Sequence, residues 1–272
     1  MKELNLEIGG LPTTIVVPEE PIAAVLLDRY AAFLAPCSTD ESVITVELLG
    51  GSLEHGYRVP TIDITGDTLT VTRHDLHAHS PDQGRTWHAR MIANEYTFDS
   101  CLRVLYTLRL LRHGGFLVHA SAQIRSGAGC IFTGKSEAGK STISRLGVDN
   151  LVLCDELPLI RRIEGRYRVW GTPFWGEFGK GTVTASGEVR ALFFLNKAPF
   201  NRSDPVSRAR ALPRLLQTTL FFSRDPAMVD AAMRHCTDFL STIPAFDLYS
   251  RPEPGVWEAV DAALEAIGHA AR

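Results

Sequence analysis

The stretch that decides the fold covers residues 130–146 and reads CIFTGKSEAGKSTISRL. Residues 134–141 within it, GKSEAGKS, match the pattern G-x-x-x-x-G-K-[ST]. The apolar residues 130–132 favour a strand before the pattern, and residues 141–146 can begin a helix after it. A strand, a glycine-rich loop and a helix in this order predict an α/β domain that binds phosphate groups at the loop.

Each residue type in this loop has a physical reason. Gly134 and Gly139 let the backbone curl so that successive N–H groups converge on an anion, and the helix start adds partial positive charge. We expect Lys140 to reach the β- and γ-phosphates and the Ser141 hydroxyl to ligate a metal ion, so the predicted cofactors are ATP and Mg²⁺. The residues predicted to bind the nucleotide are Gly134, Lys135, Ser136, Glu137, Ala138, Gly139, Lys140, Ser141 and Thr142.

A phosphate-binding loop of this kind also needs an acidic residue at the end of a neighbouring strand, where it holds the metal. Residues 151–154 read LVLC and are followed by Asp155 and Glu156. Asp155 lies 15 residues after Lys140, which leaves room for one short helix and a return turn. Two carboxylates after a strand are more often a solvated turn. Their position directly after the loop helix favours a metal-binding or base role, with Asp155 and Ser141 as the metal ligands.

The loop does not follow the first strand of the chain. It follows a predicted β-hairpin made of residues 116–124, a turn at 125–129 and residues 130–133. The hairpin with His119, the glycine-rich loop and the LCDE strand end together resemble the catalytic domain of HPr kinase/phosphorylase. That family shares its fold with phosphoenolpyruvate carboxykinase, and the resemblance extends from about residue 116 to residue 200.

The resemblance implies an α/β fold, with a P-loop domain of mixed sheet and helices after a β-rich N-terminal lobe. The expected limits are 1–97 for the lobe and 98–272 for the catalytic domain. His119 lies 21 residues before Lys140, the spacing of the family's catalytic histidine. Asp155 and Glu156 stand where the family has an Asp-Asp pair that exchanges the proton of the acceptor serine. The predicted catalytic residues are therefore His119, Lys140, Asp155 and Glu156.

The sequence also departs from the family pattern. Lys135 and Glu137 alter the interior of the loop, and Thr142 replaces a final glutamate. The family's Ile-Glu-Ile-Arg-Gly segment corresponds to RVWGTP at 168–173, which has no glutamate in step, so Glu177 is the substitute metal ligand. These departures favour the looser group of HPr-kinase-related kinases, which includes kinases of serines in ribosomally made peptide precursors.

We therefore expect an ATP-dependent kinase that transfers the γ-phosphoryl group to a serine of a protein or peptide partner. The alternatives are a small-molecule kinase with the same loop and a non-catalytic ATP-binding regulator. Members of the resembled family often assemble, so a homo-oligomer is compatible with the resemblance.

Composition limits the other function classes. The chain has 272 residues, 45% hydrophobic and 22% charged, with a net charge of −3, so no strong field favours nucleic acid or an anionic membrane as partner. Residues 1–10 lack the apolar core of a signal peptide, and no uncharged apolar run approaches membrane-spanning length. We expect a cytoplasmic protein, and the five cysteines without a C-x-x-C spacing favour neither a zinc ribbon nor a disulfide framework.

The rest of the chain has sequence patterns that are typical of strands and helices. Residues 1–97 read mostly as strands, with a hairpin over 61–73, a strand at 43–49 and a helix at 22–34. The further strands are expected at 151–154, 157–163, 166–170 and 191–195, and the further helices at 101–112, 208–222, 227–240 and 254–270.

Three other groups of residues each allow two interpretations of their role. The histidines at 74, 77, 79 and 88 follow no established metal-ligand spacing, so a metal site there is the weaker reading. The aromatic residues at 170, 174, 175 and 178 either pack in the core or line a binding groove. Arg202 either contacts the transferred phosphoryl group or lies in a helix-capping turn before Val206.

Overall fold

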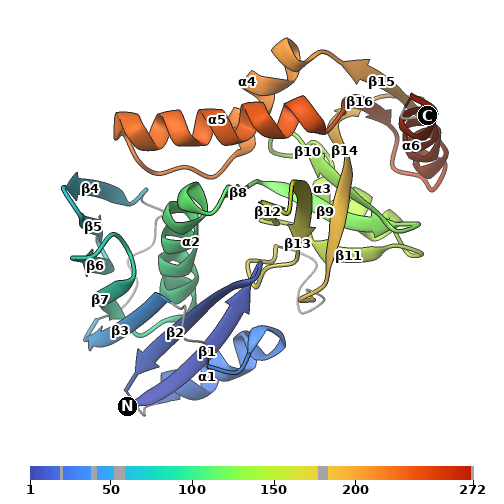
Figure 1. Ribbon diagram of the computed structural model, residues 1–272. Coiled ribbons are helices and arrows are strands. Elements are labelled where there is room, and N and C mark those ends of the chain that lie inside the picture. Colours follow the sequence, from blue (N-terminus) through green and yellow to red (C-terminus); the bar gives the residue numbers. More distant parts are fainter. Residues whose placement is uncertain (19–20, 38–41, 52–58, 177–182, 271–272) are drawn as a thin grey trace. The chain divides into compact units, whose positions relative to one another are not determined.

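The computed structural model describes residues 1–18, 21–37, 42–51, 59–176 and 183–270 (Figure 1). The chain divides into two compact units. The first comprises Met1–Arg112 and Phe221–Ala231, and the second His113–Leu220 and Ala232–Arg272. Each unit contains one mixed β-sheet with helices, which confirms the α/β class. The domain limits of 1–97 and 98–272 stay a prediction.

The first unit is built on a seven-stranded sheet in the order β1-β2-β3-β7-β6-β5-β4. Strand β3 runs parallel to both of its neighbours, and the other pairs are antiparallel. The strands are β1 (Lys2–Ile8), β2 (Leu11–Val17), β3 (Ser42–Leu49), β4 (Thr61–Thr65), β5 (Thr68–Arg73), β6 (Leu76–Ser80) and β7 (Thr86–Ile92). The predicted strand at 43–49 and the hairpin over 61–73 are confirmed.

Helices α1 (Pro21–Arg29) and α2 (Glu95–Arg112) belong to this unit. The predicted helix at 22–34 was too long: α1 ends at Arg29, and a separate 3₁₀ turn, η1, covers Ala31–Phe33. Between them the buried Tyr30 donates its hydroxyl hydrogen bond to Asp99 of α2, at 2.9 Å. Helix α2 starts six residues before the predicted residue 101 and ends at Arg112, and the turn after it contains Gly114, whose φ of +70° suits glycine.

The second unit contains a nine-stranded sheet. Its main path is β11-β9-β10-β14-β13-β12-β8, and β14 also pairs with β16, which pairs with β15. The strands are β8 (Gly115–Leu117), β9 (Ala120–Arg125), β10 (Ala128–Thr133), β11 (Leu151–Cys154), β12 (Leu159–Ile163), β13 (Arg166–Trp170), β14 (Ser186–Lys197), β15 (Arg202–Val206) and β16 (Ala245–Ser250).

Apolar residues cover both faces of this sheet. Helices α3 (Lys140–Leu146) and α6 (Val256–Ala270) pack on one face through Ile143, Val256 and Val260. Helix α4 (Arg208–Thr218) and the C-terminal part of α5 (Pro226–Thr242) pack on the other through Ala211, Leu215 and Phe239 (Figure 1). Because both faces are buried, the central strand β14 contains the continuous buried run Ala191, Leu192, Phe193, Phe194 and Leu195.

Two sequence predictions fail in this unit, and the helix predicted at 208–222 was too long, because α4 ends at Thr218. Residues 116–124 do not form one strand: β8 pairs with β12, whereas β9 pairs with β10 and β11. Between the two strands, the N–H of His119 bonds to the carbonyl of Thr218 at 2.7 Å. Residues 202–206 form strand β15, so the capping-turn reading of Arg202 was wrong. The predicted turn at 125–129 is confirmed, with Ser126 and Gly127 at positive φ.

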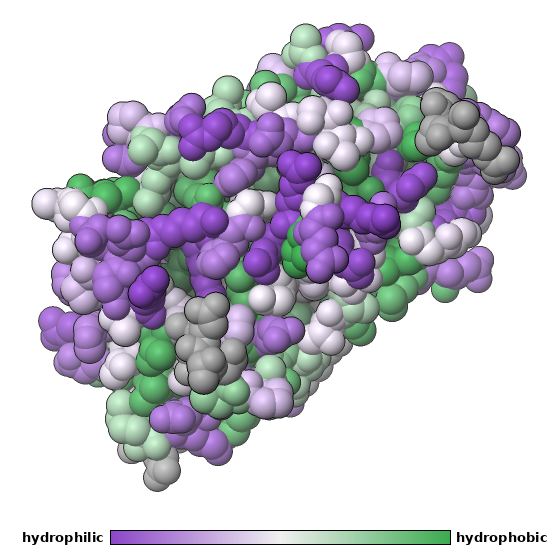
Figure 2. All heavy atoms as spheres, viewed as in Figure 1, coloured by the Kyte–Doolittle hydropathy of each residue, from purple (hydrophilic) through white to green (hydrophobic). Residues whose placement is uncertain are grey.

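Figure 2 shows hydrophilic and hydrophobic residues interspersed over the face in view. None of the helices among the described residues combines the length and the apolar character that crossing a bilayer requires.

Candidate functional site

Strand direction brings the predicted site residues to one edge of the second unit's sheet. Strands β10, β14 and β16 are parallel, so their carboxyl ends at Thr133, Lys197 and Ser250 lie at the same edge. Strand β9 is antiparallel to β10 and begins at this edge, directly after His119. Strand β11 is antiparallel to β9 and ends there, directly before Asp155. In open α/β sheets, ligands bind outside the carboxyl ends of the strands.

The glycine-rich loop joins β10 to α3 at this edge. A Cβ on Gly134 would lie 2.8 Å from the Cβ of Ala138, so the loop closes too tightly for any side chain there. Glu137 has a φ of +63°, a left-handed conformation that is uncommon for a residue other than glycine. Gly139 has a φ of +109° and precedes the first turn of α3, which contains Lys140, Ser141 and Thr142.

Buried polar side chains of β9 fix the loop helix on the sheet. The Gln123 amide donates hydrogen bonds to the carbonyl of Ile143 at 3.1 Å and to Ser121 at 3.3 Å, and it accepts one from Asn150 at 2.9 Å. Ser144 of α3 donates a further bond to Ser121 at 2.8 Å. Sequence reasoning missed this network. Its signal was the polar residues at 121 and 123, two apart in an otherwise apolar strand, which place both side chains on one face.

Lys140 is buried, with 8% of its surface exposed. Burial lowers the pKa of its ammonium group below the ordinary value of 10.5, and the carboxylate of Glu156 opposes part of that shift. A buried ammonium group has lost hydration, and a bound anion can compensate for that loss.

The two carboxylates after β11 have different surroundings. Asp155 is 2% exposed, and its Oδ1 accepts a hydrogen bond from the backbone N–H of Gly176 at 2.9 Å. The side chain of Glu156 is 33% exposed, and its Oε1 lies 3.0 Å from Nε2 of His119. The structure therefore brings together His119 and Glu156, while the buried Asp155 bonds to the backbone at Gly176.

The segment after β13 covers these carboxylates. A Cβ on Gly176 would lie 3.2 Å from carboxylate oxygens of both Asp155 and Glu156, so the backbone itself lies against them. Trp170 and Phe174 are buried, which favours the core-packing reading for both, and Trp175 is half-buried. The predicted ligand Glu177 and the aromatic Phe178 lie outside the described residues.

A cavity of 350 Å³ adjoins the loop helix. It is lined on one side by residues of the loop and α3, and on the other by the ends of β14 and β16 and the segments that follow them. The lining includes Gly139, Thr142, Ile143, Leu146, Lys197, Ser250, Arg251 and Val256. Its size is within the range of ligand pockets, about 300–1,000 Å³, and its lining is apolar with a few polar groups, as such pockets require.

The other candidate residues do not join this site. Arg202 forms an ion pair with Asp204 at 2.8 Å and lies over the rings of Phe200 and Tyr249. Of the four histidines, those at 77, 79 and 88 line a cavity against β3 and β7 in the first unit. Within the described ranges, no group of three or more His, Cys, Asp or Glu side chains is arranged to hold a metal ion.

Together, fold and site define an α/β protein with a glycine-rich loop between a strand and a helix at the carboxyl edge of a mixed sheet. The family model described as "SynChlorMet cassette protein ScmC" matches residues 95–265, which is more than half of the chain. The chain therefore belongs to the ScmC family.

Comparisons with other proteins are distant. No curated protein matches the chain. Among solved structures, it is similar to the Hpr(Ser) kinase/phosphatase from Coxiella burnetii, with 15% sequence identity and a TM-score of 0.31. That match covers 57% of this chain and 94% of the other. A likeness at this level carries no argument about chemistry.

Proposed function

We propose that this chain is an ATP-dependent kinase that transfers the γ-phosphoryl group to a serine of a protein or peptide. One observation carries the proposal: the G-x-x-x-x-G-K-S loop, with its buried Lys140, lies at the same sheet edge as the Asp155-Glu156 pair. Phosphoryl transfer requires little more than positioned phosphates, charge neutralisation and a group that accepts the hydroxyl proton. All three have candidates at this edge.

The phosphates would be bound by backbone N–H groups of residues 134–141 and by the Lys140 ammonium group. The adjoining cavity of 350 Å³ would take the nucleoside. Ser141 and Asp155 would hold a Mg²⁺ ion, because this ion is bound by oxygen atoms and is usually held by one or two carboxylates together with substrate phosphates. When bound, Mg²⁺ would neutralise charge on the phosphates.

The unequal burial of the two carboxylates suggests separate roles. Asp155 is buried and held by the Gly176 N–H, which suits a fixed metal ligand. Glu156 is partly exposed and within hydrogen-bond distance of His119, which suits a base that an acceptor hydroxyl can reach. His119 would orient this carboxylate, since its own backbone is fixed by bonds to Thr218 and Thr133.

Nucleotide binding is tested by thermal unfolding with and without Mg·ATP. At about 100 times its Kd, a ligand that binds only the folded state stabilises it by about 2.7 kcal/mol. Lys140→Ala should lose most of this stabilisation, whereas Lys2→Ala, an exposed lysine of the first unit, should keep it. An unchanged melting temperature of the wild type with Mg·ATP would refute the proposal.

Catalysis is tested with Asp155→Asn and Glu156→Gln. Glu156→Gln should keep Mg·ATP binding and slow phosphoryl transfer to serine peptides by about 10²-fold or more, as loss of a general base does. Asp155→Asn should weaken Mg·ATP binding itself. A wild-type protein that binds Mg·ATP but never transfers phosphate, to peptides or to small metabolites, would instead be a nucleotide-binding regulator.

A further inference from the structure

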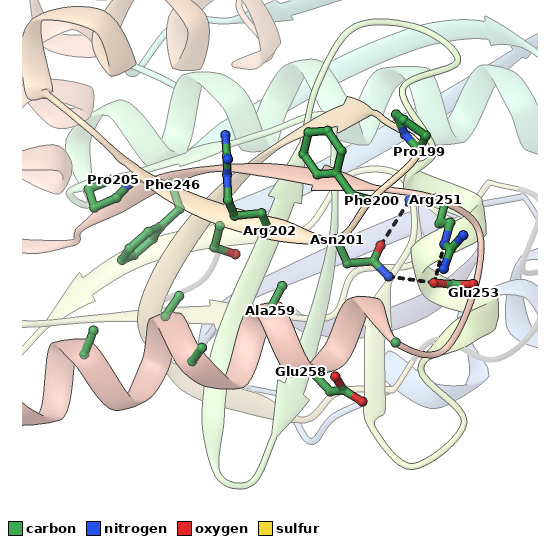
Figure 3. Close-up of a pocket in the computed structure, with 15 residues that line it drawn as sticks. Pro199, Phe200, Asn201, Arg202, Pro205, Phe246, Arg251, Glu253, Glu258 and Ala259 are labelled. Atoms are coloured by element: carbon green, nitrogen blue, oxygen red, sulfur yellow. Dashed lines mark hydrogen bonds and ion pairs between the residues drawn. The ribbon is translucent and has the colours of Figure 1, made fainter.

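A second and larger cavity, of 730 Å³, lies in the second unit between strand β15 and helix α6 (Figure 3). On the helix side, Glu258 and four alanines of α6 line it: Ala259, Ala262, Ala263 and Ala266. In Figure 3, Ala259 points from α6 toward the strands and Phe246 points from β16 toward the helix, while Arg202 extends away from the helix. Alanine side chains end at Cβ, so another chain can approach this side of the helix closely.

Strand β15 borders this groove and has a free edge. It pairs with β16, and no other strand of the described residues pairs with it. Residues of an antiparallel pair alternate between hydrogen-bonded and non-hydrogen-bonded positions, and Pro205 has no N–H to donate. Pro205 and Ser203, two residues apart, therefore take the non-hydrogen-bonded positions. The N–H and C=O of Ser203 and the C=O of Pro205 then face the free edge.

Ser203 also has an unsatisfied side chain. Its Oγ is buried and has no hydrogen-bond partner among the described residues, and Ser203 lines the cavity. A buried hydroxyl without a partner is costly, and a rotation of the Ser203 side chain that lets the hydroxyl bond to a ligand in the groove would remove that cost. Backbone and side chain thus offer donors and acceptors at one position of the groove.

One end of the groove lies next to the candidate nucleotide cavity, and hydrogen bonds connect the residues that line this end. Asn201 donates a hydrogen bond to Glu253 at 2.9 Å and accepts one from the Arg251 N–H at 3.1 Å (Figure 3). Arg251 lines both the 730 Å³ groove and the 350 Å³ cavity beside the loop helix. Beyond Pro205 and Phe246, the groove continues into a cavity of 470 Å³ that reaches Arg208.

From these observations we propose that the groove along β15 binds an extended peptide segment, which pairs with the free edge at Ser203. An unpaired strand edge is complemented by another extended backbone, and peptides are recognised in this way by strand addition. Pro205 restricts the pairing to the region around Ser203. Because Arg251 lines both cavities, this groove lies beside the candidate nucleotide cavity.

The test uses the full-length chain and a pool of heptapeptides with a central serine and random flanking residues. Retention of peptides by the protein is measured by equilibrium dialysis and mass spectrometry. Ala262→Trp fills the groove from an exposed helix position, and Ser203→Ala removes the unsatisfied hydroxyl without adding bulk. Glu265→Trp is the matched control, because Glu265 is exposed on α6 and lines neither part of the groove. Thermal unfolding verifies that each variant is folded.

We expect the wild type and Glu265→Trp to retain the same peptides, with retention about tenfold weaker or more for Ala262→Trp and several-fold weaker for Ser203→Ala. No retention by the wild type, or equal retention by all variants, would overturn the proposal. A wild-type dimer that Ala262→Trp dissociates would also overturn it, since the groove would then bind a second copy of the chain. Mg·ATP binding, measured separately, should be equal in all four proteins. Its absence would refute the kinase proposal and leave the peptide result standing.

Discussion

Replacing Gly134 by alanine gives the sharpest test of how the glycine-rich loop is built. The new Cβ would lie 2.8 Å from the Cβ of Ala138 and 3.5 Å from the carbonyl oxygen of Leu195. Ordinary carbon–carbon contacts are about 3.5–4.0 Å, so residues 134 and 138 must separate by about 1 Å. The φ of Gly134 is not in the left-handed region, so the effect is steric. Overpacking of this kind costs about 1–3 kcal/mol.

If the loop binds phosphate in the conformation described, that cost appears in nucleotide affinity. Gly134→Ala should bind Mg·ATP about 5- to 150-fold more weakly, the factor that 1–3 kcal/mol represents. Isothermal titration calorimetry measures this directly, and thermal unfolding of the same samples separates a loop effect from a loss of folding.

A second substitution, at the opposing residue Ala138, should restore the nucleotide affinity that Gly134→Ala loses. Ala138→Gly removes the opposing Cβ, so the double variant with Gly134→Ala should regain most of the affinity. Ala138→Gly alone should lose only what added backbone freedom costs, about 0.5–1 kcal/mol. We expect a coupling energy of at least about 1 kcal/mol between the two positions. Wild-type affinity in Gly134→Ala, or a double variant no better than the single one, would refute the steric argument.

Two further predictions concern buried polar groups of the second unit. Gln123→Leu removes the hydrogen bonds to Ile143, Ser121 and Asn150 and should lower the free energy of unfolding by about 1–3 kcal/mol, measured by urea denaturation; an unchanged midpoint would contradict the anchoring role. Arg214→Met removes the ion pair with the buried Asp247, at 2.7 Å, and should destabilise the protein by about 2–4 kcal/mol at pH 7. Burial acts to raise the pKa of Asp247, but hydrogen bonds from Arg214 and Asn196 outweigh it, so this pKa lies below its ordinary value of 3.8. A carboxylate with a lowered pKa contributes stability above its unfolded-state pKa and loses it as the pH falls through its folded-state pKa. The difference between wild type and Arg214→Met should therefore be full at neutral pH and shrink below about pH 4; a difference independent of pH would contradict this assignment.

The residues of the candidate site could be proposed from the sequence where a short stretch of chain restricts which residue types fit. The loop needs glycines where the backbone turns tightly, a lysine at a helix start and an apolar strand before it, and all of these lie within residues 130–146. Asp155 and Glu156 were predictable for the same reason, since one short helix and one strand connect them to the loop. Tight local geometry leaves few residue types that fit, so it is visible in the sequence.

Strand pairing between distant segments could not be predicted in this way. At the break between β8 and β9, the N–H of His119 bonds to a carbonyl 99 residues later, that of Thr218, and nothing in residues 116–124 encodes that bond. Likewise, β15 was read as a turn because its five residues, RSDPV, have turn-forming character when taken alone.

What the sequence by itself determined is the phosphate-loop motif, its strand and helix, the α/β class and the acidic pair after β11. What only the tertiary structure decided is the unequal burial of Asp155 and Glu156, the anchoring of α3 by β9, and the groove between β15 and α6. The physical reason is that backbone hydrogen bonds between strands are nearly independent of side-chain identity. Which strands pair, and which surfaces stay open between them, is therefore set by how all the apolar faces pack together and not by any one segment.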